Sequence, residues 1–154
     1  MIGREIQIIT SPFGLRKLGQ REHLHHGVDL RSVNFENYTY KDQDIITPEQ
    51  CEVLRVGTDK QKNNYIVVKP LDSYHMGYRE LKFIHVDDYA LKNITPGDIM
   101  GKGAFLGYAV SAGTGKHLHF ETWVGYTSKR LRPINPVNYF IEMKIKFEYK
   151  AGII

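Results

Sequence analysis

The stretch SAGTGKHLHFETW, residues 111–123, carries two histidines one residue apart at the start of an apolar run. Its side chains alternate between polar and apolar types, and a period of two is typical of a β-strand with one buried face. His117 and His119 would share one face of such a strand, and Leu118 and Phe120 would share the other. The two imidazoles are either half-buried polar groups on an ordinary sheet or part of a metal site, and the rest of the chain bears on this choice.

Short alternating segments recur along the chain, and its 14 glycines and 6 prolines are spread between them. No segment keeps a 3.6-residue apolar period for three turns, although INPVNYFIE (134–142) could form one short helix. We therefore expect a mostly β domain, built on an antiparallel sheet with little helix. The expected strands lie within REIQIIT (4–10), CEVLRVG (51–57), NYIVVKP (64–70), ELKFIHV (80–86) and EMKIKFEYK (142–150).

Bulk composition narrows the class of protein. A chain of 154 residues with 42% hydrophobic residues can bury one core, so we expect a single domain over residues 1–154. Cys51 is the one cysteine, which excludes a disulfide within the chain. No stretch approaches the ~20 apolar residues of a membrane span, and the first residues do not resemble a signal peptide. The net charge of +4 comes from scattered lysines and arginines, so we expect no nucleic-acid partner.

A second histidine cluster, HLHHGVDL, occupies residues 23–30. His25 and Asp29 are four residues apart, a spacing that returns both side chains to one side in a helix or a strand, and Gly27 lets the backbone between them bend. Imidazole and carboxylate groups are zinc ligands, and a catalytic zinc site keeps three protein ligands. His23 and His26 are alternatives to His25 as the ligand from this cluster. Together with the strand histidine His85, the two clusters favour a hydrolytic metal site over a polar surface.

Five motifs in order resemble the lysostaphin/LytM-type zinc endopeptidases of peptidoglycan. The resemblance covers residues 10 to 140 and implies the antiparallel β domain of that family, also called a duplicated hybrid motif. One departure is that Phe83, two residues before the strand histidine, is an aromatic residue without a hydroxyl group. The motifs are SPFGLR (11–16), HHGVDL (25–30), FIHVD (83–87), PGDIMGKG (96–103) and GTGKHLHFE (113–121).

The resemblance also implies the site residues. His25, Asp29 and His119 correspond to the zinc ligands of the family, and His117 and His85 correspond to its catalytic histidines beside the zinc-activated water. Which of these two is the general base stays open. The implied activity is zinc-dependent hydrolysis of peptide bonds in peptidoglycan cross-links or stem peptides. The alternative is a catalytically inactive wall-binding or regulatory module of the same fold, although such relatives typically lack the ligands that are present here.

The expected substrate is therefore a bacterial peptidoglycan peptide, either an oligoglycine bridge or a D-alanyl–meso-diaminopimelate link, and the expected state is a monomer. Such a protein acts on the cell wall, in the periplasm or outside the cell. Because no leader is visible, we expect release by lysis machinery or carriage on a phage virion, as for an endolysin or tail lysin. A zinc hydrolase of some other peptide or amide would share the site but not the substrate.

Overall fold

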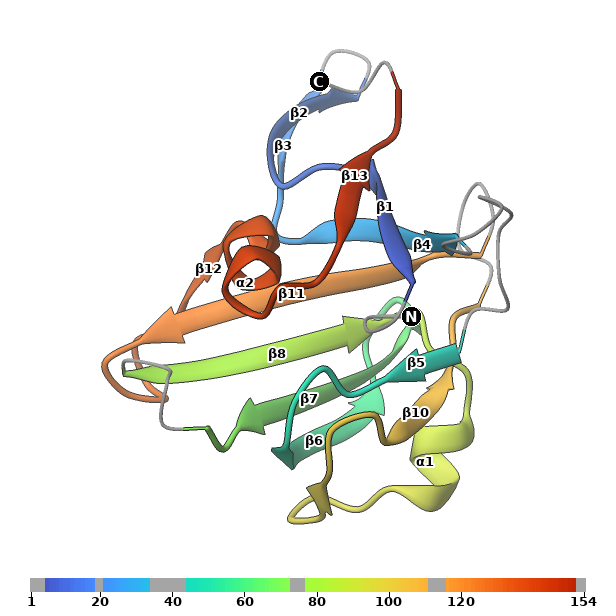
Figure 1. Ribbon diagram of the computed structural model, residues 1–154, viewed down its shortest axis with the longest axis vertical. Coiled ribbons are helices and arrows are strands. Elements are labelled where there is room, and N and C mark those ends of the chain that lie inside the picture. The colour runs from blue at the N-terminus through green and yellow to red at the C-terminus, as the bar shows by residue number, and fades with distance from the viewer. Residues whose placement is uncertain (1–4, 19–20, 34–43, 73–76, 111–115, 152–154) are drawn as a thin grey trace.

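The computed structural model describes residues 5–18, 21–33, 44–72, 77–110 and 116–151 (Figure 1). The described elements are mostly short strands, which confirms the predicted fold class. In chain order they are β1 (Ile6–Ser11), β2 (Gly14–Leu18), β3 (Arg21–His25), β4 (Val28–Val33), β5 (Asp44–Ile46), β6 (Cys51–Thr58), β7 (Asn64–Pro70), β8 (Tyr78–Ile84), α1 (Tyr89–Asn93), β9 (Ile99–Met100), β10 (Phe105–Tyr108), β11 (Leu118–Gly125), β12 (Arg132–Ile134), α2 (Pro136–Glu142) and β13 (Phe147–Tyr149).

One large sheet forms the centre of the domain. Its strand order is β13-β1-β4-β11-β8-β7-β6-β9, with β12 paired to β11 outside this path. The pair β1–β13 is parallel, and the other pairings between described strands are antiparallel. Two ribbons, β5–β10 and β2–β3, stand apart from it, and the β2–β3 hairpin projects beyond the sheet at the top of Figure 1.

Strand β11 lies between β4 and β8 and shows the predicted alternation. Leu118 and Phe120 are completely buried in the core, whereas His117 and His119 are half-buried. The imidazoles therefore lie on the face of the sheet opposite the core. This placement follows from the period of two in the sequence, because a central strand in an antiparallel sheet can bury one face and leave the other available for chemistry.

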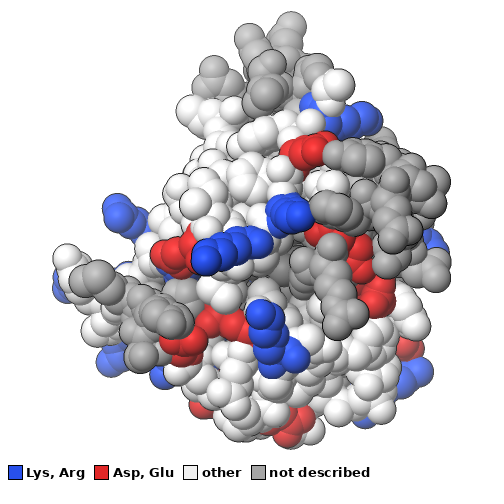
Figure 2. All heavy atoms as spheres, viewed as in Figure 1, with Lys and Arg blue, Asp and Glu red and all other residues white. Residues whose placement is uncertain are grey.

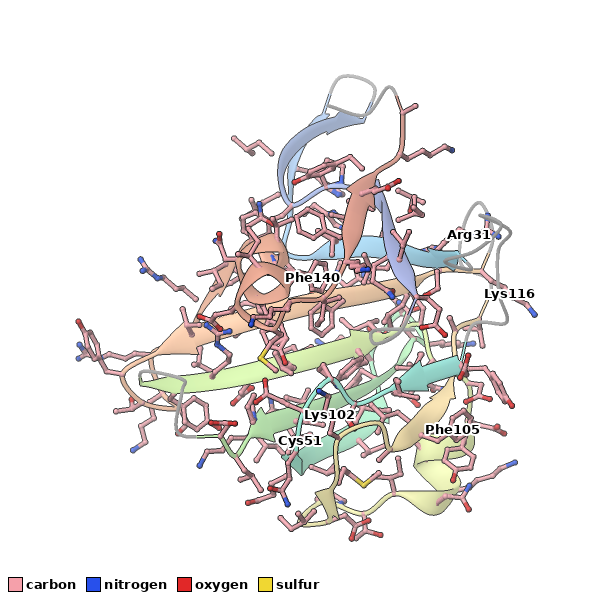
Figure 3. All side chains as sticks on the ribbon, viewed as in Figure 1. Arg31, Cys51, Lys102, Phe105, Lys116 and Phe140 are labelled. Carbon is pink, nitrogen blue, oxygen red and sulfur yellow. The ribbon has the colours of Figure 1, made fainter. Side chains whose placement is uncertain are left out.

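Helix α2 covers the core side of β11. Pro136 occupies its first turn and the Asn135 side chain accepts a hydrogen bond from the Val137 N–H, which satisfies a free amide at the helix start. Phe140 points from α2 onto the sheet, where its ring stacks on Phe120 with centroids 5.7 Å apart (Figure 3). The predicted short helix is confirmed.

The tail departs from the predicted strand over residues 142–150. Met143 caps α2, since its N–H donates to the Tyr139 carbonyl, and Lys144 has a left-handed φ of 56°. The extended segment therefore begins only at Phe147. No helix among the described residues has the length and apolarity needed to cross a membrane.

Candidate metal centre

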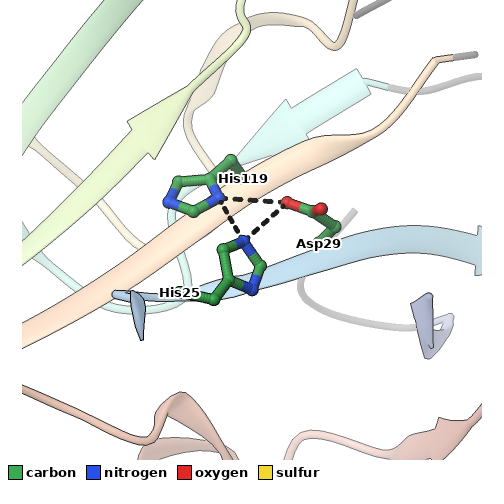
Figure 4. A group of neighbouring side chains, drawn as sticks. All are labelled: His25, Asp29 and His119. Carbon is green, nitrogen blue, oxygen red and sulfur yellow. Dashed lines mark hydrogen bonds and ion pairs between the residues drawn. The ribbon is translucent and has the colours of Figure 1, made fainter. Parts of the chain in front are cut away.

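Three side chains capable of binding a metal meet on the face of the sheet opposite the core (Figure 4). The Nδ1 atom of His119 lies 3.0 Å from Asp29 Oδ1 and 3.1 Å from His25 Nε2. The triangle is closed by His25 Nε2 and Asp29 Oδ1, which are 3.4 Å apart. Among the described residues, these side chains form the one group of histidine, cysteine or acidic side chains compact enough to hold a metal ion.

Strand pairing brings these groups together from segments 90 residues apart in sequence. His119 of β11 is the direct antiparallel partner of Asp29 in β4, so the two side chains project from the same face. His25 ends β3, and residues 26–27 connect it to β4. The predicted proximity of the two histidine clusters is therefore confirmed.

Gly27 keeps the connection to β4 close against β11. A Cβ atom at this position would lie 2.2 Å from the Phe120 carbonyl oxygen and 2.8 Å from Cγ of Glu121. The sequence suggested that a glycine is needed here for a bend. The structure instead shows a close approach of two backbones, in which only a hydrogen atom fits between the chains.

Replacing Gly27 with alanine should therefore destabilise the domain and disturb the metal centre. We expect the free energy of unfolding to fall by about 3 kcal/mol, the upper range for an overpacked core, and the melting temperature to fall by about 10 °C. Gly101→Ala is the matched control, because a Cβ atom at Gly101 has no heavy atom within 4 Å. Thermal unfolding of both variants by circular dichroism tests this, and equal melting temperatures would contradict it.

The geometry and donor chemistry of the triangle fit zinc. Ligand atoms about 2.0–2.1 Å from a tetrahedral zinc ion lie about 3.3 Å from one another, and the three observed edges are 3.0, 3.1 and 3.4 Å. Two imidazole nitrogens and one carboxylate oxygen form the ligand set of a catalytic zinc site, which leaves a fourth position for water or substrate.

Hydrogen bonds to groups outside the triangle orient both imidazoles, so that His25 Nε2 and His119 Nδ1 face each other within it. His25 Nδ1 donates to the Pro12 carbonyl at 2.8 Å, and His119 Nε2 donates to Glu121 Oε2 at 2.8 Å. Glu121 is itself held by the Trp123 indole N–H, 2.6 Å from its Oε1. Such partners set the tautomer and orientation of histidine ligands. Glu121 shares the strand face of His119, two residues away, whereas a carbonyl partner such as that of Pro12 leaves no signal in residue identity.

Strong electrostatic coupling links the members of the triangle. Burial alone would raise the pKa of Asp29, but hydrogen bonds with His119 and His25 outweigh burial and hold the pKa of this carboxyl well below its usual range. Burial alone would lower the pKa of His119, but hydrogen bonds to Asp29 and Glu121 raise this pKa to about 9. Without metal, His119 is therefore an imidazolium held between two carboxylates at neutral pH.

Zinc affinity should consequently increase with pH. Zinc must displace the proton from His119 Nδ1 at any pH below the His119 pKa of about 9. The apparent affinity should therefore rise about tenfold per pH unit between about pH 7 and 8.5 and level off above the pKa. Chelator competition at a series of pH values tests this. In Glu121→Gln the lost negative charge should lower the His119 pKa and move the plateau to lower pH, whereas a wild-type affinity that does not change with pH would contradict the account.

His85 and His117 lie beside the triangle. Their ring centroids are 5.1 Å apart, and the His85 and His119 centroids are 6.1 Å apart. His117 Nε2 is 3.9 Å from Asp29 Oδ1, longer than any edge of the triangle. Burial lowers the pKa of His85, and the neighbouring His117 and His119 lower it further. Both predicted catalytic histidines therefore face the same space as the candidate ligands, and their roles stay predictions.

The backbone at His85 explains how this residue reaches the site. Simple alternation along ELKFIHV would place His85 with Phe83, which is fully buried in the core. Instead, His85 follows the end of β8 and adopts a left-handed φ of 69°. This conformation is uncommon for residues other than glycine, and it turns the ring toward His117. The aromatic residue that the family resemblance associates with this histidine, Phe83, is part of the core.

Two other described histidines, His23 and His26, lie outside the triangle. His26 is exposed and packs edge-on against Trp123 with centroids 5.7 Å apart, and His23 is exposed on the β2–β3 hairpin. Of the three histidines that could have supplied this ligand, His25 is the one that joins the triangle. His75 and the glycine-containing segment 111–115 lie outside the described residues.

Comparison with known proteins agrees with this geometry. The fold is similar to the NMR solution structure of lysostaphin, with a TM-score of 0.64 and 18% identity over 96% of this chain and 55% of that chain. It is also similar to the antimicrobial peptidase lysostaphin from Staphylococcus simulans (TM-score 0.65, 16% identity, 97% of this chain and 54% of that one). A third similar structure is that of LytU (TM-score 0.59, 20% identity, 87% and 84%). The chain spans about half the length of lysostaphin.

At these sequence identities, the structural similarity shows that the fold is shared. The assignment to a family rests on the sequence. No curated protein matches the chain. Residues 22–136, which include every candidate site residue, match the sequence profile of Peptidase family M23. The match covers most of the chain and confirms the resemblance found in its motifs: the chain belongs to Peptidase family M23, the family of LytM/lysostaphin-type peptidases.

Proposed function

We propose that this protein is a zinc-dependent endopeptidase that hydrolyses peptide bonds in bacterial peptidoglycan. The observation that carries the proposal is the triangle of His25 Nε2, Asp29 Oδ1 and His119 Nδ1, with edges between 3.0 and 3.4 Å and two further imidazoles beside it. Membership of a peptidase family supports peptide hydrolysis. An inactive binding module would need neither a complete ligand set nor the neighbouring His85 and His117.

His25, Asp29 and His119 would hold the zinc ion. Zinc in such a site would act as a Lewis acid, which lowers the pKa of water to about 7 and polarises the scissile carbonyl. The residues of the chain supply the proton transfers and the orientation. Glu121 and the Pro12 carbonyl keep the two ligand imidazoles in their binding tautomers, as their hydrogen bonds of 2.8 Å indicate.

His117 and His85 would carry the proton chemistry. In the assignment we favour, His117 accepts a proton from the attacking water and passes it to the leaving amine, while His85 orients the water or donates to the developing oxyanion. Their ring centroids are 5.1 Å apart, so the reverse assignment uses the same geometry. The Nε2 atom of His117 lies 3.9 Å from Asp29 Oδ1, close enough to act on a group bound between the ligands.

The chain would work as one domain over residues 1–154, as a monomer acting at the cell wall. Figure 2 shows basic and acidic side chains interspersed over the described part of one face, without a single-sign surface there. Over this face, recognition of the substrate would rest on contacts within the site more than on long-range electrostatic attraction.

Digestion of defined wall fragments tests the proposal and identifies the bond. Zinc-loaded protein is incubated with oligoglycine-bridged and with diaminopimelate-linked muropeptides, and products are identified by mass spectrometry. We expect cleavage of one class at a single type of peptide bond, lost on chelation and restored by zinc. Zinc binding without cleavage of either substrate would favour the inactive binding module, and cleavage only of peptides unrelated to the wall would favour a different hydrolase.

A further inference from the structure

The turn between β6 and β7 is tightly organised although its side chains are mostly exposed. The Asp59 carboxylate accepts hydrogen bonds from the backbone N–H groups of Gln61 and Asn63, each at 2.9 Å. The Asp59 N–H donates to the Asn63 carbonyl at 3.0 Å, and the Lys62 N–H donates to the Asp59 carbonyl at 3.0 Å. Asp59 therefore fixes the position of Asn63.

This turn lies against the backbone of His85. The His85 N–H donates to the Asn64 carbonyl at 3.1 Å, and the His85 carbonyl accepts from the Val110 N–H at 2.9 Å. These two hydrogen bonds hold the residue on both sides of its left-handed φ of 69°. The turn therefore helps to maintain the backbone conformation that directs the His85 ring away from the core face of β8.

The same turn also contacts the His85 ring. Asn63 Oδ1 lies 3.1 Å from His85 Nδ1. An amide oxygen only accepts hydrogen bonds, so the ring nitrogen facing it must carry the proton. In the neutral ring, this arrangement leaves Nε2 without a proton and able to accept one.

We propose that Asn63 is a positioning residue that fixes His85 in the Nδ1–H tautomer, which leaves Nε2 to orient the attacking water as a hydrogen-bond acceptor beside His117. Because an Nε2 atom without a proton cannot donate to the oxyanion, this tautomer selects the water-orienting role for His85. The inference rests on the proposed function, in which the His85 ring acts on the reacting groups. It deepens that function by assigning a role to a residue outside the metal centre. Asn63 acts through His85 and is not itself a catalytic residue.

The first test reads the tautomer directly in metal-free protein without substrate. Long-range ¹H–¹⁵N correlation spectra of histidine-labelled protein at pH 8 distinguish the protonated from the unprotonated ring nitrogen of His85. We expect the Nδ1–H form in the wild type. Asn63→Asp, which keeps an acceptor oxygen, should retain this form. Asn63→Ala should show a mixture of both tautomers. Gln61→Ala, an exposed change in the same turn, is the matched control and should match the wild type.

The second readout is kinetic. Asn63→Ala should lower kcat about tenfold with KM changed less than about twofold, because only a fraction of molecules keeps the productive tautomer. Asn63→Asp should keep more of the activity than Asn63→Ala. An Nε2–H tautomer in the wild type, or a tautomer unaffected by Asn63→Ala, would overturn the inference. Failure of the proposed function would give a different result. The spectra would show the expected tautomers, but no variant would cleave wall peptides.

Discussion

A His119→Ala protein is expected to bind no zinc at neutral pH and to cleave no wall peptide. His119 Nδ1 forms two of the three edges of the ligand triangle, at 3.0 Å to Asp29 Oδ1 and 3.1 Å to His25 Nε2. Without this imidazole, a zinc ion would keep one nitrogen and one oxygen from the chain, below the three protein ligands of a catalytic site. We expect zinc affinity to fall more than about 100-fold, beyond the loss seen on removing an outer partner of a ligand.

Metal content after dialysis, measured by mass spectrometry, checks this prediction. His23→Ala is the control, because His23 is exposed on the hairpin that carries His25 but lies outside the triangle. It should retain one zinc per chain. If the His119 variant retained stoichiometric zinc, or if the His23 variant lost it, the ligand set would be wrong.

Replacing His117 with alanine should separate catalysis from metal binding. His117 Nε2 lies 3.9 Å from Asp29 Oδ1, outside the triangle of ligand atoms, so zinc should stay bound at one ion per chain. Loss of a positioned acid or base typically lowers turnover by about 10²- to 10⁴-fold, and we expect kcat to fall within this range. Cleavage of the muropeptide identified by digestion gives the rate, and metal analysis of the same sample gives the occupancy.

Lys116→Ala provides a matched control for this variant. Lys116 is exposed at the neighbouring position (Figure 3), and its removal should leave both rate and zinc content near the wild-type values. A His117 variant with full activity would remove His117 from the mechanism. A variant that lost zinc would make His117 a ligand and not a proton carrier.

The face assignment of β11 and the grouping of its histidines with Asp29 could be predicted from the sequence. Alternation with a period of two separates His119 from Phe120, and the order of the motifs allowed the segments to be assigned to one site. The triangle then follows because β4 and β11 pair directly, with His119 opposite Asp29. A local pattern determines which face a side chain occupies, but strand order comes from the whole fold.

Other features depend on backbone geometry that residue types do not encode. The alternation of ELKFIHV places His85 in the core, and only its φ of 69° turns it toward His117. Gly27 has the residue type expected for a bend, yet it is required by a backbone approach that would leave a Cβ atom 2.2 Å from the Phe120 oxygen. Asn63 is adjacent to no motif and reaches His85 across a hairpin turn. Such contacts join residues far apart in sequence, so no local pattern reports them.

The most direct test of the account is an anomalous-difference map at the zinc edge from crystals of the zinc-loaded protein. The account predicts one peak about 2.0–2.2 Å from each of His25 Nε2, Asp29 Oδ1 and His119 Nδ1, with His85 and His117 outside the coordination sphere. A map with no peak between these atoms, or with its peak on another set of side chains, would contradict it.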